Sequence, residues 1–370
     1  MLLFTPGPTP VPQNVRDAMS HETIHHRTPE FEAIFEKTRT HLFKLFGMDE
    51  VVMLASSGTG AMEASVINLC HNTLLNINSG KFGERFGKIA KANALNSVEI
   101  KNEWDTPASV KEVLEALEAN PNIDAIAIQI SESAGGLRHS VEDIAAAVKK
   151  HNPDIMVIAD GITAIGVERI DVSNIDALIA GSQKALMLPP GLAIVGLSAK
   201  AIEKIGSGRG YYFNLASEIK SQRKNTTAYT AATTLIIGLC EILQNIEDSG
   251  GFDKLYEQTA LRAKALEGAM RALGLSIYPK NPARSMTTVV DKESNAIRKI
   301  LKNDYEVNVA GGQDHLSGEI FRINQMGLIK DYELSWVANA VELALHKIDR
   351  RAYDGTASRV FNEIYFGIKN

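Results

Sequence analysis

The sequence is poor in cysteine: Cys70 and Cys240 are the only two among its 370 residues. Two thiols cannot form a framework of several disulfides or a four-cysteine zinc site, which excludes a disulfide-stabilised secreted fold. Long apolar runs are also missing. The longest, at 235–243, contains Glu241 and is far shorter than the roughly 20 residues that span a membrane. The opening MLLFTPGPTPVP has no basic segment and is not typical of a signal peptide. We therefore expect a protein of the reducing cytoplasm.

A surplus of positive charge is lacking too. Lys and Arg total 39 against 44 Asp and Glu, a net charge of −5, whereas proteins that bind the phosphate backbone of nucleic acids carry a basic surplus. Apolar residues make up 45% of the chain, which is enough for a sizeable core. Length and composition together indicate an enzyme-sized protein with a large domain and a smaller one, or with two domains of medium size.

Short apolar runs alternate with helical segments from Val51 onward. This alternation predicts an α/β fold with a mostly parallel, doubly wound sheet, and the nearly continuous apolar runs are typical of strands buried on both faces. The predicted strands are Val51–Ala55, Thr73–Ile77, Asp124–Ile130, Ile155–Ala159, Asp176–Ala180 and Leu192–Leu197. The helices predicted between them are Gly60–Leu69, Phe82–Ala94, Pro107–Ala119 and Val141–Lys150.

The pattern changes after Leu197, and long helical segments follow on either side of the break Asp248-Ser249-Gly250-Gly251. We expect three parts: an extended proline-rich arm over 1–16, a large cofactor-binding domain over 17–247 and a small C-terminal α+β domain over 248–370. The elements expected in this region are strands Ser285–Val290 and Glu319–Asn324 and helices Ala231–Ile246, Phe252–Leu273, Ala296–Asn303, Glu333–Lys347 and Arg359–Phe366.

Common nucleotide and zinc motifs are absent. No G-x-G-x-x-G follows a predicted strand, and neither G-x-x-x-x-G-K-[ST] nor H-E-x-x-H occurs. In an open parallel sheet, ligands bind beyond the carboxyl ends of the strands. The polar segments directly after the predicted strands are therefore the candidates for a site, at 56–60, 78–83, 131–136, 160–164 and 181–184.

The segment Ser56-Ser57-Gly58-Thr59-Gly60 lies between a predicted strand and a predicted helix. Small residues let backbone N–H groups approach a phosphate, and the positive end of the helix dipole favours the anion. An ordinary capped helix start is the alternative interpretation.

Asp160 follows a buried strand, and Lys184 lies between two apolar stretches. The aspartate suits a protonated ring nitrogen, or it simply caps the next turn. A desolvated lysine is a nucleophile toward an aldehyde, while a structural lysine is the alternative. Pyridoxal 5'-phosphate requires a phosphate-binding loop, an acid and a buried amine, and the three candidates together meet this requirement. Phe82 is a candidate for the stacking ring, or else a core aromatic at a helix start.

These motifs resemble those of the class V aminotransferases, which are pyridoxal-phosphate enzymes of fold type I, and most closely the alanine/serine–glyoxylate branch. The matching segments run in order along nearly the whole chain: FTPGPTPVP, SSGTGAMEA, GKFGER, SESAGG, ADGITAIG, GSQKAL, AYTAATT and IFRIN.

The resemblance implies a role for each matching residue. Lys184 corresponds to the lysine that holds the aldehyde of the cofactor and moves a proton, and Asp160 to the partner of the ring nitrogen. Arg322 corresponds to the arginine that binds the α-carboxylate of the substrate, a role that suits a guanidinium fork. The remaining contacts implied are Gly58, Thr59, Gly60 and Gln183 at the phosphate, Phe82 (where close relatives often have Trp) and Ile162 on the two faces of the ring, and Ser133 near the phenolic oxygen. Thr227 (where some relatives have Tyr) and Thr230 are implied to reach the phosphate of a neighbouring subunit in a homodimer.

The implied reaction is transamination from an L-amino acid of the serine, alanine or aspartate class to glyoxylate, pyruvate or 2-oxoglutarate. No nucleic-acid or membrane partner is expected. A class V cysteine desulfurase is one alternative, although it needs a nucleophilic cysteine on a mobile C-terminal loop, and Cys70 and Cys240 both fall in predicted helices. A non-catalytic protein that retains the cofactor fold is the other alternative.

Overall fold

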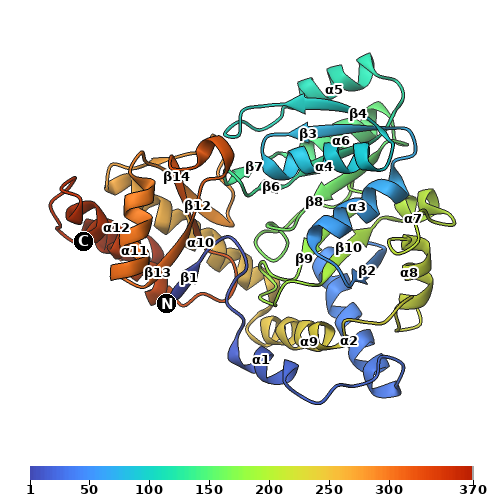
Figure 1. Cartoon of the computed structure of the whole chain (residues 1–370), viewed down its shortest axis with the longest axis horizontal. Helices are drawn as coiled ribbons and strands as arrows, with labels where there is room; N and C mark the ends of the chain where they lie inside the picture. Colours follow the sequence, from blue (N-terminus) through green and yellow to red (C-terminus); the bar gives the residue numbers. More distant parts are fainter. Residues whose placement is uncertain (369–370) are drawn as a thin grey trace.

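The computed structural model describes residues 1–368, which form two main sheets covered by helices (Figure 1). The large sheet has seven strands in the order β2-β10-β9-β8-β5-β3-β4, and the small sheet has five in the order β1-β13-β14-β12-β11. The strands of the large sheet are β2 (Glu50–Leu54), β3 (Thr73–Asn78), β4 (Asn96–Lys101), β5 (Ile123–Gln129), β8 (Met156–Asp160), β9 (Ala177–Gly181) and β10 (Ala193–Leu197). Those of the small sheet are β1 (Leu2–Phe4), β11 (Ser276–Ile277), β12 (Met286–Val290), β13 (Val307–Gly311) and β14 (Ile320–Asn324), and β6 (Ser131–Glu132) and β7 (Leu137–Arg138) form a separate short ribbon.

The large sheet confirms the predicted mostly parallel, doubly wound fold. Neighbouring strands pair in parallel from β4 to β9, and β10 alone runs antiparallel to both its neighbours. Every strand predicted from the apolar runs is present, with ends shifted by no more than one residue. The sequence did not reveal β4, because this edge strand alternates exposed and half-buried residues and therefore has no apolar run.

Helices cover both faces of the large sheet, because alternate residues of a strand point to opposite sides. In β5, Ile126 and Ile128 join one core cluster while Ala125 and Ala127 join the other. One cluster is covered by α2 (Pro29–Phe46), α5 (Val110–Ala119), α6 (Val141–His151) and α9 (Thr233–Asp248). The other is covered by α3 (Gly58–Leu69), α4 (Lys81–Ala92), α7 (Ala199–Ile205) and α8 (Leu215–Gln222).

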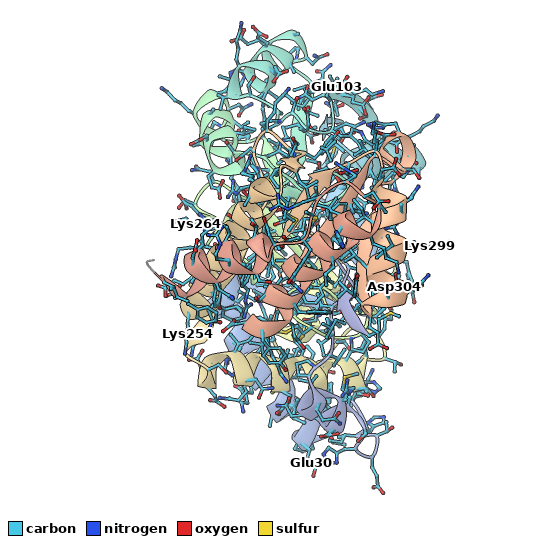
Figure 2. All side chains as sticks on the ribbon, turned by 90° about the vertical axis from the view of Figure 1, so that its left-hand side faces the viewer. Glu30, Glu103, Lys254, Lys264, Lys299 and Asp304 are labelled. Carbon is cyan, nitrogen blue, oxygen red and sulfur yellow. The ribbon has the colours of Figure 1, made fainter. Side chains whose placement is uncertain are left out.

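The small sheet has its own core cluster, and the helices packed into it are α10 (Gly251–Ala272), α11 (Ser294–Asp304), α12 (Asp331–Lys347) and α13 (Thr356–Phe366). A short 3₁₀ turn, η1 (Asp314–Leu316), precedes β14. Exposed charged side chains cover the outer helices of this part, among them Lys254 and Lys264 on α10 and Lys299 and Asp304 on α11 (Figure 2).

The N-terminal arm is more ordered than its prolines indicate. Leu2–Phe4 pairs in parallel with β13, which makes the start of the chain an edge strand of the small sheet. The proline-rich first dozen residues contain no helix, as predicted, and α1 (Gln13–Met19) begins directly after Pro12 and packs on α9. Proline is well tolerated at a helix start. The domain boundaries at 16/17 and 247/248 stay predictions.

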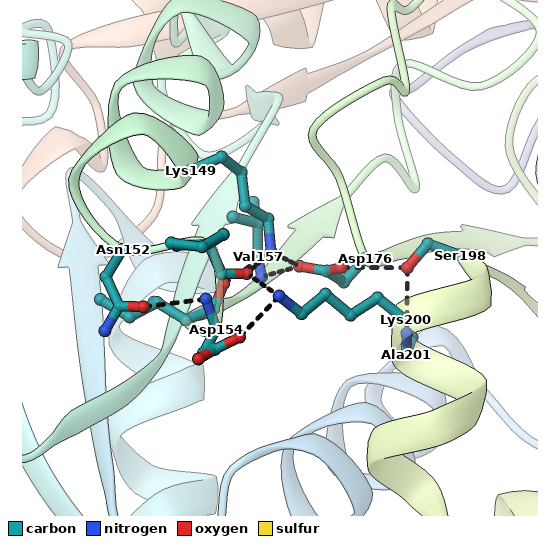
Figure 3. A network of polar contacts seen from close by, with 10 residues as sticks. Lys149, Asn152, Asp154, Val157, Asp176, Ser198, Lys200 and Ala201 are labelled. Atoms are coloured by element: carbon teal, nitrogen blue, oxygen red, sulfur yellow. Dashed lines mark hydrogen bonds and ion pairs between the residues drawn. The ribbon is translucent and has the colours of Figure 1, made fainter.

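A buried polar network fastens the amino ends of the central strands, opposite the end where a site is expected (Figure 3). Asp176, just before β9, accepts hydrogen bonds from the Val157 N–H at 2.7 Å and the Ser198 hydroxyl at 3.0 Å, and it pairs with the Lys149 ammonium.

No helix within residues 1–368 has both the length and the apolar composition needed to cross a membrane.

Candidate active site

Asp160 and Lys184 lie at the carboxyl ends of neighbouring parallel strands. Asp160 is the last residue of β8, and Lys184 follows β9 by three residues (184 − 181). In register, Asp160 stands opposite Ile179 of β9 on one side and Gln129, the last residue of β5, on the other. Two candidates that are far apart in the sequence are thus brought to the same edge of the sheet.

Burial shifts the pKa of each group in the direction that favours its neutral form. Burial raises the pKa of Asp160 to about 6. The Ile162 N–H that donates to its Oδ1 and the positive charges of Arg85 and Lys184 act in the opposite direction. Burial lowers the pKa of Lys184 to about 8, against the negative charge of Asp160. A lysine with such a pKa has a substantial neutral fraction near physiological pH, and the neutral amine is the nucleophile.

The N-terminal arm closes over Lys184, a position that sequence reasoning did not assign to it. The Lys184 ammonium donates to the carbonyl oxygen of Pro6, and the Thr9 hydroxyl donates to the Lys184 carbonyl at 2.7 Å. Gly7, which lies between Pro6 and Thr9 in the sequence, has φ +112°, and a Cβ there would lie 2.6 Å from the lysine nitrogen. The backbone conformation at position 7 therefore favours glycine, and a Cβ there would displace the end of the Lys184 side chain.

Gly7→Ala is expected to lower transaminase activity about tenfold or more, because the added methyl group displaces the reacting amine. Initial rates and thermal unfolding should be measured together. Gly274→Ala is the matched control: its φ is +78°, but no atom lies within 4 Å of the added Cβ. The control should lose some stability and keep its activity, and equal activity in the two variants would contradict the assignment.

The loop before α3 has the features of an anion site. The N-cap residue Ser57 makes no side-chain hydrogen bond to the first turn, so the simple capped helix start is not what the structure shows. A Cβ on Gly58 would lie 2.4 Å from Ile162 and one on Gly60 1.8 Å from the Ser56 hydroxyl, so both glycines are fixed by packing. Nearby, the amide oxygen of Gln183 is buried without a hydrogen-bond partner within residues 1–368.

Phe82 lies in the first turn of α4, and Arg85 lies one turn further along the same helix. The Arg85 guanidinium carbon is 4.6 Å from the centroid of the Phe82 ring, and its Nη1 donates to the Thr59 hydroxyl at 2.8 Å. Sequence reasoning missed Arg85. The signal for it is its position three residues after Phe82, which places both side chains on one helix face.

Arg322 reaches the site from the small sheet. It lies on β14, donates from Nη1 to the carbonyl of Ser133 and from Nε to the carbonyl of Gly311 at 3.1 Å. Burial lowers the pKa of Arg322 to about 10, while the negative charge of Glu132 acts in the opposite direction. Arg322 is therefore in contact with the backbone of Ser133.

The two threonines lie apart from these groups within the chain. Thr227 and Thr230 belong to the segment between α8 and α9, and Thr227 donates to the Tyr229 carbonyl at 2.6 Å. Among the described residues, neither hydrogen-bonds to the loop at 58–60, Asp160 or Lys184. The other predicted site residues lie at the ends of strands of the large sheet or in the segments that follow them, except Arg322, which reaches them from β14.

Comparisons with known proteins show the family of the chain. The family model for aminotransferase class-V matches residues 1–327. An uncharacterized aminotransferase of Helicobacter pylori is 52% identical over 369 residues, covering 100% of both chains, and the serine–glyoxylate aminotransferase of Methylorubrum extorquens is 28% identical over 364 residues, covering 93% of this chain and 90% of the relative. Among solved structures, an aspartate aminotransferase of subgroup IV from Thermus thermophilus superposes with a TM-score of 0.88 at 30% identity, covering 94% of this chain and 100% of that one. The chain therefore belongs to the class V aminotransferase family and is a transaminase of fold type I.

Proposed function

We propose that the enzyme uses pyridoxal 5'-phosphate to move an amino group from an L-amino acid of the serine, alanine or aspartate class to a 2-oxo acid such as glyoxylate, pyruvate or 2-oxoglutarate. The observation that carries the proposal is the placement of Lys184 beside Asp160, with Arg322 reaching the same edge of the sheet. Relatives named for serine, aspartate and glyoxylate support this choice of substrates.

The residues present fit the cofactor. A buried amine suits its aldehyde, a buried carboxylate suits its ring nitrogen, and the glycine-lined loop before α3 with the unpartnered Gln183 amide oxygen suits a protonated phosphate oxygen or a bridging water. When bound, pyridoxal phosphate supplies an electron-poor ring that stabilises negative charge at the substrate Cα.

The chain itself binds, orients and moves a proton. Arg322 holds the α-carboxylate through its planar fork, which fixes the orientation of the substrate. The Lys184 amine, neutral for a substantial fraction of the time, would remove the proton from the substrate Cα and deliver it to the carbon of the cofactor that carried the aldehyde. The Asp160 carboxylate keeps a positive charge stable at the ring nitrogen.

The desulfurase alternative lacks a suitable cysteine. Cys70 is the buried C-cap residue of α3, where burial and the nearby Asp124 raise the pKa of its thiol to about 12. Cys240 lies within α9 and is half buried. A nucleophilic cysteine for this reaction needs an accessible position on a mobile loop, whereas Cys70 is buried and Cys240 lies inside a helix.

The proposal includes a homodimer with shared active sites in the cytoplasm. The segment at 226–228 lines an open cavity of about 470 Å³ together with Arg27, Lys220 and Lys224, so the threonine and several cations face outward from the chain. This surface suits the phosphate end of a neighbouring site.

A panel of donors and acceptors tests the substrate range. Purified enzyme with serine, alanine or aspartate should aminate at least one of glyoxylate, pyruvate and 2-oxoglutarate, as followed by chromatography of both products. Sulfide release from cysteine serves as the check on the alternative. A holoenzyme that aminates none of the three 2-oxo acids but releases sulfide would contradict the proposal.

Cofactor loading should depend on pH through Lys184. Because the neutral amine reacts, the rate at which the visible absorption band appears should rise roughly tenfold per pH unit below the lysine pKa and level off above it, with a midpoint at about 8. Asp160→Asn removes the negative charge that holds this pKa up, so the midpoint should move to lower pH. A flat profile, or a shift to higher pH in the variant, would contradict the assignment.

A further inference from the structure

Glu132 is a buried carboxylate that none of the roles above uses. It ends the short strand β6, directly before Ser133, and its side chain is completely buried. A carboxylate is rarely buried to this extent unless several donors compensate it. The donors are therefore the first indication of what it does.

All three donors to Glu132 are backbone N–H groups, and two of them belong to the first turn of α4. Its Oε2 accepts from Phe82 and Gly83 at 2.9 Å each, and its Oε1 accepts from Ala134 at 3.0 Å. The N-cap residue of α4, Gly80, offers no side chain to cap this turn. A carboxylate placed there satisfies otherwise unpaired N–H groups and interacts favourably with the helix dipole.

Gly80 leaves the space that this contact requires. A Cβ at Gly80 would lie 2.4 Å from the carboxyl carbon of Glu132 and 2.8 Å from its Oε2. Glu132 thus approaches α4 closely, and its hydrogen bond with the Phe82 N–H fixes the backbone at Phe82. Burial raises the pKa of Glu132 to about 7, and the three backbone donors oppose that shift.

We infer that Glu132 is a positioning residue that holds the first turn of α4 so that the Phe82 ring lies against the cofactor. Its neighbour Ser133 binds Arg322 through its carbonyl, so two consecutive residues connect the stacking ring and the carboxylate-binding arginine. The inference rests on the proposed function, since it assumes that Phe82 stacks on pyridoxal phosphate.

A double-mutant cycle tests whether Glu132 acts through Phe82. The readout is the dissociation constant of apo-enzyme for pyridoxal phosphate, measured by titration, with the induced circular dichroism of the bound cofactor as a second signal. Phe82→Ala and Glu132→Ala should each weaken binding about two- to tenfold, the range expected for loss or misplacement of one stacking ring. The double variant should bind no more than about twofold more weakly than Phe82→Ala alone.

Glu342→Ala is the matched control. Glu342 is also completely buried, and it accepts backbone N–H bonds from Asp354, Thr356 and Ala357 at the start of α13, in the small-sheet part. Its loss should lower the unfolding temperature much as the loss of Glu132 does, with cofactor affinity unchanged. This separates positioning from general stability.

Glu132→Gln covers the case in which the alanine variant does not fold. Its amide oxygen still accepts at α4, so cofactor affinity and the dichroism signal should fall between wild type and Glu132→Ala, or change less than in Phe82→Ala. Unchanged cofactor affinity in Glu132→Ala would overturn the inference. If only Glu132→Gln folds, unchanged affinity in that variant would do the same. The inference would also fail if removing Glu132 weakened cofactor binding equally in the wild type and in Phe82→Ala. A wild-type chain that binds no pyridoxal phosphate would instead overturn the proposed function itself.

Discussion

Lys184→Ala is expected to lower transaminase turnover by at least about ten-thousandfold and to remove the visible absorption band of the holoenzyme. The variant loses the nucleophile for the aldehyde and the base for the Cα proton at once, and such general base catalysis alone contributes roughly 10² to 10⁴. Single-turnover rates with each amino donor, together with the absorption spectrum after addition of pyridoxal phosphate, measure the two losses separately.

Two further arms make this result specific. A small primary amine added to Lys184→Ala should restore part of the proton transfer, because it occupies the space of the missing side chain. Lys149→Ala is the control: Lys149 is likewise well buried, and it pairs with Asp176 at the amino ends of the strands. The control should unfold at lower temperature and retain its band, whereas comparable turnover in Lys184→Ala and wild type would refute the role of the lysine.

The sequence was sufficient to predict the central sheet because buried parallel strands are continuous apolar runs. It was also sufficient for Asp160 and Lys184, since the carboxyl ends of parallel strands meet at one edge whatever the loops between them do. The edge strand β4 was missed because its side chains do not form an apolar run. The strand β1 was missed because it has only three residues and its pairing with β13 is a tertiary contact.

The missed site residues have a common physical reason. Glu132 and the arm residue Gly7 act through contacts with segments distant in the sequence, and local spacing carries no information about such contacts. Arg85 differs, since its spacing to Phe82 was visible, but only the structure shows it against the ring and the Thr59 hydroxyl. A family resemblance transfers positions of known role and does not reveal supporting groups that this chain has for itself.

Asp160→Asn is expected to slow the chemical step about 100- to 1000-fold while making the apo-enzyme no less stable. The slower step follows from losing a preorganised negative charge at the ring nitrogen. The unchanged stability follows from the sign of the pKa shift, since burial raises the pKa of Asp160 from 3.8 to about 6. The stability that the protonated Asp160 contributes to the folded state is fully present below pH 3.8 and is lost as pH rises through about 6. Removing the charge should therefore relieve up to about 3 kcal/mol at neutral pH, less the cost of burying the amide.

Asp176→Asn should show the opposite effects, a loss of stability with an unchanged chemical step. Asp176 is the buried partner of Lys149 in the network at the far end of the same strands (Figure 3). Its neutralisation leaves a buried ammonium unpaired, which lowers the unfolding temperature and leaves the chemical step unchanged. Thermal unfolding of both apo-variants at pH 7, with single-turnover rates of the cofactor-loaded forms, separates the two aspartates. If Asp160→Asn destabilises as Asp176→Asn does and reacts as fast as wild type, then Asp160 is a structural residue, and the site has no acid at β8 for a ring nitrogen.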